Sequence, residues 1–255
     1  MARTLAIVNQ KGGVGKTTTA VHLAAGLAGN NRRTLLIDLD VQGNASSIFC
    51  DEARPERSAF ELFRNREADL NLYLSTRMSN LFLLPAVLQL AEVETMLTGA
   101  VDGFFRLDEW LGRAGSSFDY VIIDCPPNLG VLPVNALVAS DYLVMPLQAS
   151  RFSLDGIKGM LGTCEIVNKR YNAELAVAGA VMTQFNARTA IAQAMVEHIE
   201  ALLPLYATRI SRSVAVEEAV VMKQTIFEYE PGSKVALEYQ SLLGEIIDGI
   251  EKRSV

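Results

Sequence analysis

Short apolar runs alternate with longer amphipathic segments along the chain. Consecutive apolar positions are typical of strands that are buried on both faces of a sheet, and they occur over residues 3–9, 34–40, 120–126, 141–147 and 175–183. Helix-length segments lie between or after these runs, over residues 16–29, 154–169, 191–203 and 233–250. Strands that alternate with helices predict a doubly wound, mostly parallel α/β sheet with helices on both faces. Ligands of such folds bind beyond the carboxyl ends of the strands.

A glycine-rich stretch, "NQKGGVGKTTTA", follows the first predicted strand over residues 9–20. Glycines allow positive φ angles and close approach, so backbone N–H groups here can surround phosphate oxygens at the start of a helix. Lys16 is expected to reach the β- and γ-phosphates, and the Thr17 hydroxyl to ligate Mg²⁺. The usual pattern G-x-x-x-x-G-K-[ST] is met except that Gln10 replaces the first glycine. The predicted nucleotide-binding residues are Gly12, Gly13, Val14, Gly15, Lys16, Thr17 and Thr18.

Carboxylates end two of the predicted strands. Asp124 closes "IIDCPP", where it can hold a magnesium-bound water, and Asp38 and Asp40 lie together in "LLIDLD". A single aspartate at a strand end is more often a turn residue or a helix cap, but two such ends beside a phosphate loop favour catalysis. Asp40 is better placed than Asp38 to face a γ-phosphate and orient an attacking water. The two histidines, His22 and His198, lie on predicted helices and are expected to be structural.

Composition narrows the class of protein. The chain has 255 residues, of which 50% are hydrophobic and 20% charged, which is ordinary for a globular protein. We expect one domain over residues 1–255, because no linker, repeat or low-complexity tract divides it. Its three scattered cysteines suggest neither a disulfide framework nor a metal site, which favours a reducing cytoplasm. A net charge of -6 argues against coating nucleic acid indiscriminately but allows a local basic patch.

Three motifs together resemble the deviant Walker A ATPases of the ParA/Soj and MinD group. They are "KGGVGKTT" (11–18), "DLDVQGNAS" (38–46) and "DYVIIDCPPNLG" (119–130), and similar segments follow over 81–97, 144–157 and 179–188. The resemblance implies a P-loop ATPase fold with ATP and Mg²⁺ as cofactors. Val41 departs from the usual proline, Ser150 from a common glutamate, and residues 211–234 only loosely follow the usual arginine-containing loop.

The resemblance also implies a role for the second lysine of the loop. In these ATPases the front lysine, here Lys11, crosses a homodimer interface and touches the partner's nucleotide. Two nucleotides that face each other concentrate negative charge, which a lysine supplied in trans compensates while the γ-phosphate is present. Lys16 would then hold the nucleotide and Lys11 would report it to the other subunit. The alternative is an exposed loop lysine of little energetic value.

Members of the ParA branch bind DNA without sequence preference in the ATP state, and a ParB-like partner stimulates hydrolysis. The resemblance therefore implies segregation of chromosome or plasmid DNA by a cytoplasmic, nucleoid-associated protein. Arg188 in "FNARTA" matches an arginine implicated in DNA contact, and Arg209 and Arg212 in "TRISRS" are candidate neighbours. Each of the three could also be an ordinary solvated side chain. Because the first strand begins almost at once, we expect the short type without an N-terminal helix-turn-helix domain.

Other functions stay open at this point. One is a positioning ATPase for a protein cargo. Another is a MinD-like membrane ATPase, but Glu245, Asp248 and Glu251 in the final helical segment would be repelled by an anionic membrane. Iron–sulfur carriers need paired cysteines that the chain lacks. A scaffold that binds ATP without hydrolysing it is disfavoured by Asp40.

Overall fold

One sheet runs through the part of the chain that the structure describes. This computed structural model describes residues 2–149, 153–187 and 190–253. The strands are β1 (Arg3–Ile7), β2 (Thr34–Asp38), β3 (Leu74–Ser75), β4 (Leu81–Leu84), β5 (Tyr120–Asp124), β6 (Tyr142–Leu147), β7 (Ala176–Phe185) and β8 (Leu205–Ser211). They lie in the order β3-β4-β2-β5-β1-β6-β7-β8, and among these described strands only β3 pairs antiparallel. The predicted doubly wound, mostly parallel fold is confirmed.

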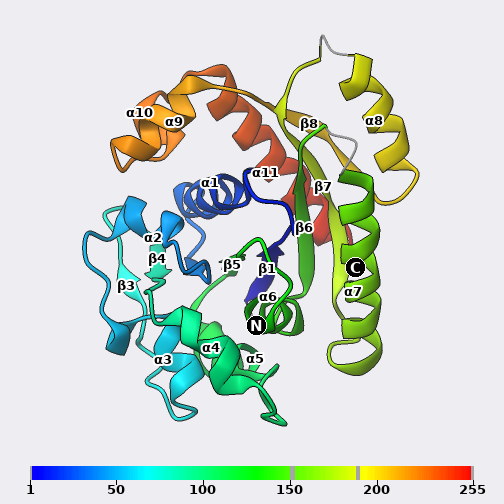
Figure 1. Cartoon of the computed structure of the whole chain (residues 1–255). Helices are drawn as coiled ribbons and strands as arrows, with labels where there is room; N and C mark the ends of the chain where they lie inside the picture. The colour runs from blue at the N-terminus through cyan, green and yellow to red at the C-terminus, as the bar shows by residue number, and fades with distance from the viewer. Residues whose placement is uncertain (1, 150–152, 188–189, 254–255) are drawn as a thin grey trace.

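Helices cover both faces of this sheet (Figure 1). They are α1 (Lys16–Gly29), α2 (Asn44–Phe49), α3 (Ala59–Arg64), α4 (Leu90–Leu97), α5 (Arg106–Ala114), α6 (Val131–Val138), α7 (Ser153–Arg170), α8 (Ala190–Glu200), α9 (Val214–Val221), α10 (Ile226–Tyr229) and α11 (Lys234–Arg253), with 3-10 turns at Pro55–Arg57 and Gly115–Ser117. Side chains alternate along a strand. Leu5 and Ile7 of β1 therefore pack toward α1 and α11, whereas Ala6 and Val8 pack toward the layer that contains α3 to α8.

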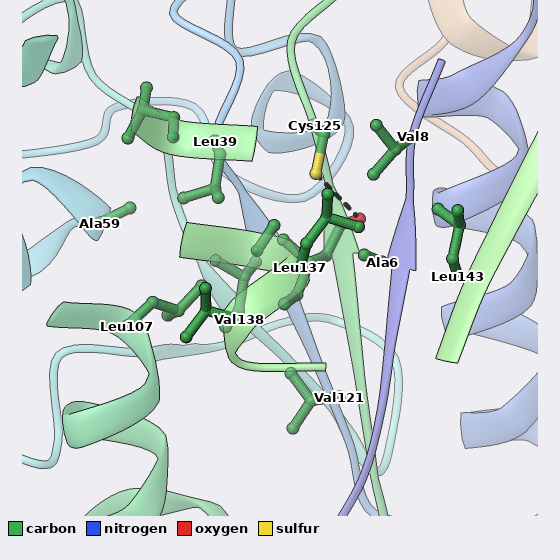
Figure 2. Packing of buried hydrophobic residues seen from close by; sticks show 14 of the residues in the cluster. Ala6, Val8, Leu39, Ala59, Leu107, Val121, Cys125, Leu137, Val138 and Leu143 are labelled. Carbon is green, nitrogen blue, oxygen red and sulfur yellow. Dashed lines mark hydrogen bonds between the residues drawn. The ribbon is translucent and has the colours of Figure 1, made fainter. Parts of the chain in front are cut away.

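Figure 2 shows part of the core on the second of these faces. Ala6 from β1, Val8 just after that strand, Val121 from β5 and Leu137 from α6 gather there, and all four are buried. Cys125 follows β5 directly and turns its thiol into the same core, where the Sγ lies 3.9 Å from the carbonyl oxygen of Ile123. The buried face thus extends up to the residue beside Asp124, so the strand ends rest on a packed layer.

The predicted strands end two residues earlier than expected at three places, after Ile7, Asp38 and Asp124. After Asp38 the chain makes one further bond to β5, from Leu39 N to the Asp124 carbonyl (3.0 Å). A turn then closes with a bond from Gly43 N to the Asp40 carbonyl (2.8 Å). The polar residues at these ends therefore leave the sheet.

The sequence predicted the first helix correctly but did not predict three of the strands. The helix over residues 16–29 is confirmed at both ends. The pattern did not separate β3, β4 and β8 from loops, because β3 and β4 span two and four residues and β8 is a half-exposed edge strand. The apolar side chains of α11 pack in the core with α1, as expected for a helix that covers the sheet. None of the described helices combines the length and the apolar character needed to cross a bilayer.

His22 connects α1 to α10 inside this layer. Its Nε2 accepts a hydrogen bond from Ile226 N (2.9 Å), so Nδ1 carries the proton and donates to the Thr18 carbonyl (2.6 Å). The ring stacks on Tyr239 of α11 with 4.5 Å between centroids. Burial lowers the pKa of His22 to about 4, so the imidazole is neutral at physiological pH. The histidine is a core residue that fixes the first turns of α1, as the sequence predicted.

Candidate active site

The glycine-rich loop joins the carboxyl end of β1 to the first turn of α1. Gly13 and Gly15 have φ angles of 74° and 79°, in the left-handed region that glycine adopts most easily. A Cβ on Gly15 would also lie 3.6 Å from the methyl group of Thr183, in ordinary contact. The backbone conformation, more than crowding, therefore requires these two glycines.

The N–H groups of the loop are available to a ligand. From Gly12 to Thr17, no backbone N–H donates a hydrogen bond to a described residue; the first such bond runs from Thr19 to the Gly15 carbonyl (2.9 Å). The carbonyls are used instead: Val14 O accepts from the Thr183 hydroxyl at 2.7 Å. Because C=O and N–H point in opposite directions across a trans peptide, such carbonyl contacts turn the N–H groups the other way. The loop thus presents unpaired donors, as a phosphate site requires.

The two lysines of the loop are linked. Lys16 is buried, and its Nζ donates to the backbone carbonyl of Lys11 over 2.9 Å. Burial lowers the pKa of Lys16, and the charges of Asp124 and then Asp40 oppose the shift. The backbone of Lys11 is held by Asn9, whose Oδ1 accepts from Lys11 N at 2.9 Å. Lys16 therefore lies beside both candidate carboxylates, and Lys11 is at the half-buried front of the loop.

Asp124 is a buried carboxylate toward which the Thr17 hydroxyl donates only weakly. It pairs in register with Asp38 of β2, and neither of its oxygens accepts a bond of acceptable geometry from a described residue. Burial raises its pKa well above the usual value, and the charges of Asp38 and Asp40 add to this effect. Thr17 and Lys16 favour the charged form without compensating it. A buried oxygen pair beside a threonine hydroxyl fits a hard cation such as Mg²⁺, held directly or through water.

Asp38 and Asp40 have different surroundings. Asp38 is fully buried and accepts from Ser46 N (2.8 Å) and Ser46 Oγ (2.7 Å), so it ties the end of β2 to α2. Burial raises the pKa of Asp38 to about 6, and these hydrogen bonds oppose the shift. Asp40 accepts one bond on Oδ1, from Gln42 N (3.0 Å), and its other oxygen accepts none from a described residue. This geometry supports Asp40, and not Asp38, as the group that can face a ligand.

A cavity of about 100 Å³ lies beside the loop. Its lining combines loop and helix residues with the ends of β7 and β8, and comprises Gly15, Thr18, Thr183, Gln184, Ile210, Ser211, Arg212, Ser213, Val216, Glu217 and Tyr239. Thr183 and Gln184 line the cavity from the end of β7. Of the residues after β8, the sequence analysis named only Arg212, and as a DNA contact; Ser213, Val216 and Glu217 were missed, because nothing in their pattern shows that β8 pairs beside β7.

Of the three candidate arginines, the structure describes two, and these two do not share one face of the sheet. Arg188 lies outside the described residues. Arg209 is partly buried, with its Nη2 3.8 Å from Glu200 Oε1 on α8. Arg212 is exposed and lines the cavity beside Gly15. Because Arg209 lies on β8 on the face opposite to buried Ile210, Arg209 and the cavity belong to different faces of the sheet. Arg209 and Arg212 are therefore poor neighbours for a shared contact.

Comparisons with known proteins fit this geometry. The sequence profile of the AAA domain family matches residues 2–177. The sporulation initiation inhibitor protein Soj of Bacillus subtilis (strain 168) is 37% identical over 249 residues, which cover 96% of this chain and 98% of Soj. The chain belongs to the ParA/Soj family of P-loop ATPases. Another family member, the chromosome partitioning protein ParA of Myxococcus xanthus (strain DK1622), is 35% identical over 97% of this chain and 88% of its own length.

A solved structure extends the similarity to the fold. Cobyrinic acid a,c-diamide synthase from Mycobacterium smegmatis, with bound ATP analog and magnesium, aligns with a TM-score of 0.86 at 30% identity. The alignment covers 99% of this chain and 97% of that one. The ParA/Soj relatives and this structure therefore match the chain over nearly its whole length, which includes the segments that carry the loop and the strand ends.

Asp124→Asn tests two effects of this carboxyl group in the ParA/Soj-family chain: its effect on the stability of the ligand-free protein and its effect on ligand binding. The amide cannot ionise, so it avoids the cost of a buried carboxyl group whose pKa burial already raises well above its usual value, and the nucleotide-free variant should melt a few degrees higher than the wild type. Adding Mg²⁺ with ADP should then raise the melting temperature of the wild type much more than that of the variant. Differential scanning calorimetry with and without both ligands makes the comparison. A nucleotide-free variant less stable than the wild type would contradict the assignment of an uncompensated carboxylate.

Proposed function

We propose that this chain is a Mg²⁺-dependent ATPase that dimerises when it binds ATP and partitions DNA. The observation that carries the proposal is the meeting, at one sheet edge, of an open N–H loop, Lys16 and the buried Asp124, whose oxygens accept no well-formed hydrogen bond from a described residue. A triphosphate and a cation together would satisfy all three. The ParA/Soj relatives support partition as the purpose, since two of them carry names of chromosome partitioning or sporulation control.

Each residue has a distinct part in hydrolysis. The N–H groups of residues 12–17 and the Lys16 ammonium bind the β- and γ-phosphates. The Thr17 hydroxyl and Asp124 would hold Mg²⁺, Asp124 through a water, and the ion would neutralise charge that develops on the phosphates. Asp40, which keeps one oxygen without a donor, orients the attacking water. Thr18 and the cavity residues bind the sugar and base side of ATP.

Asp40→Ala tests the hydrolytic step. The variant should still bind ATP and dimerise, because the loop, Lys16 and Lys11 are unchanged. Its phosphate release should fall by about 10²-fold or more, as expected when a positioning group is lost. Phosphate release is measured alongside sedimentation with ATP, and Asp248→Ala, an exposed acidic residue on α11, is the matched control. Unchanged turnover in Asp40→Ala would remove this residue from the mechanism.

Dimerisation is assigned to Lys11. Its backbone carbonyl is occupied by Lys16, so the loop fixes where the Lys11 side chain starts, at the half-buried entrance of the site. A second copy that presents its own nucleotide to this entrance would place a triphosphate opposite Lys11. Charge compensation in trans then depends on the γ-phosphate, and its hydrolysis dissolves the pair.

Lys11→Ala separates nucleotide binding from association. The variant should bind ATP with nearly wild-type affinity, because Lys16 and the loop N–H groups remain, yet it should stay monomeric. Lys16→Ala should instead lose nucleotide affinity and everything that follows from it. Sedimentation with ATP and with ADP, next to a direct binding measurement, distinguishes the two, and Lys252→Ala serves as a control. A Lys11→Ala protein that binds ATP and dimerises normally would show that Lys11 is only a loop residue.

DNA binding is proposed for the ATP dimer, with Arg188 as the leading contact. Arg212 is exposed and can contribute, whereas Arg209 is engaged with Glu200 and contributes least. Because the chain carries a net charge of -6, its basic groups must act from one local face, which dimerisation doubles. A ParB-like partner would stimulate hydrolysis and release the protein, which we place in the cytoplasm at the nucleoid.

Arg188→Ala should weaken binding to duplexes of every sequence by a similar factor while basal ATPase is unchanged. The slope of log affinity against log salt should become shallower by roughly one unit per lost phosphate contact. Arg170→Ala, at the far end of α7, is the control, because that helix end lies at the opposite edge of the sheet (Figure 1).

If the ATP-bound wild type ignores DNA at low salt, partition on DNA is wrong. Binding to anionic vesicles would then indicate the MinD-like alternative. Binding to neither DNA nor vesicles would overturn both the partition proposal and the MinD-like alternative.

A further inference from the structure

The carbonyl of Gly13, in the middle of the phosphate loop, accepts two side-chain hydrogen bonds. Gln148 Nε2 donates to it over 2.8 Å and Gln184 Nε2 over 3.1 Å. Gln148 directly follows β6, and Gln184 lies near the end of β7, where Leu147 of β6 pairs with Met182. Two neighbouring strands therefore hold the same peptide group of the loop.

This double contact fixes the direction of an N–H group. In the trans peptide between Gly13 and Val14, the carbonyl and the Val14 N–H point in opposite directions. With both glutamines on the carbonyl side, the Val14 N–H is turned away from them, and it donates to no described residue. The next peptide is held in the same manner, because Thr183 Oγ1 donates to the Val14 carbonyl and so directs the Gly15 N–H.

Gln184 adopts an unfavourable conformation to make its contact. Its φ angle is 48°, in the left-handed region that costs a residue with a Cβ about 1 kcal/mol or more. It also lines the cavity beside Gly15 and Thr18. A single exposed side chain thus spans the space between the cavity and the phosphate loop, and the strain at its backbone sits at the candidate site.

We propose that Gln148 and Gln184 are positioning residues that orient the Val14 N–H toward the phosphates before a nucleotide arrives. The proposal rests on the proposed nucleotide-binding function and assigns part of its affinity to preorganisation of the loop. Either glutamine alone satisfies the Gly13 carbonyl, and removing both leaves that carbonyl without a side-chain donor. The two losses should therefore reinforce each other beyond simple addition.

The test compares Gln148→Met, Gln184→Met and the double variant in their affinity for Mg-ADP and Mg-ATP by titration calorimetry. Methionine keeps the length of the side chain and removes the donor. Each single variant should bind both nucleotides about 3-fold more weakly, and the double variant about 30-fold or more, because the coupling between contacting groups is not additive. ADP and ATP should lose affinity equally, since the loop contacts do not need the γ-phosphate. Gln240→Met, an exposed glutamine on α11, should bind like the wild type.

Kinetics provide a readout that general loosening of the fold would not reproduce. In the double variant KM for ATP should rise with the affinity loss while kcat at saturation stays within about 3-fold of wild type, because binding energy is lost without disturbing Asp40. The charged side chain of Gln184→Glu cannot donate to the Gly13 carbonyl. This variant should therefore bind both nucleotides more weakly than Gln184→Met does. A double variant that binds ADP like the wild type, or only as the product of the two single effects, overturns the proposal and leaves the ATPase function standing. A wild-type protein that binds neither nucleotide overturns both.

Discussion

The buried carboxyl group of Asp124 is the constraint around which the site is arranged. The carboxylate is fully buried at the end of the central strand β5, and no described donor satisfies either oxygen. Its neighbours make the charge harder to keep: Asp38 and Asp40 both raise its pKa, and Lys16 compensates only in part. Burying this carboxyl group costs free energy of folding. The apolar side chains buried in the two layers that cover the sheet offset that cost.

The surrounding polar groups divide between fixing the backbone and facing the ligand. Asp38 gives its hydrogen-bonding capacity to Ser46, and Asn9 gives its own to Lys11 N and to the Pro146 carbonyl. His22, neutral because it is buried, anchors the first turns of α1 to α10. These residues use their hydrogen bonds to fix other parts of the chain. Asp40, Asp124 and the loop N–H groups keep unused capacity, and that difference identifies the ligand-facing set.

The two lysines of the loop are joined by a hydrogen bond, but their side chains are expected to have different roles. The Lys16 ammonium lies inside the site, near the carboxylates, and donates a hydrogen bond to the Lys11 carbonyl. The position of Lys11 therefore depends on Lys16, although Lys16 lies five positions later in the chain. A change at Lys16 would disturb the entrance of the site as well as the phosphates, which is why a comparison of the two lysines needs both binding and association as readouts.

The sequence by itself determined the fold class, the phosphate loop and the two carboxylate strand ends. Those features follow from local chemistry: consecutive apolar residues make buried strands, and Gly13 and Gly15 supply backbone angles that other residues avoid. It could not distinguish Asp38 from Asp40 beyond a preference, since the difference lies in two hydrogen bonds from Ser46, which comes later in the chain. The sequence also did not predict the roles of Gln148 and Gln184, because their partner, Gly13, lies far away in the chain. Only the pairing of β6 with β7 brings their side chains onto one carbonyl, and only the packing of β8 separates Arg209 from the cavity beside Gly15. Contacts between segments far apart in the chain depend on strand order, which a single sequence pattern does not encode.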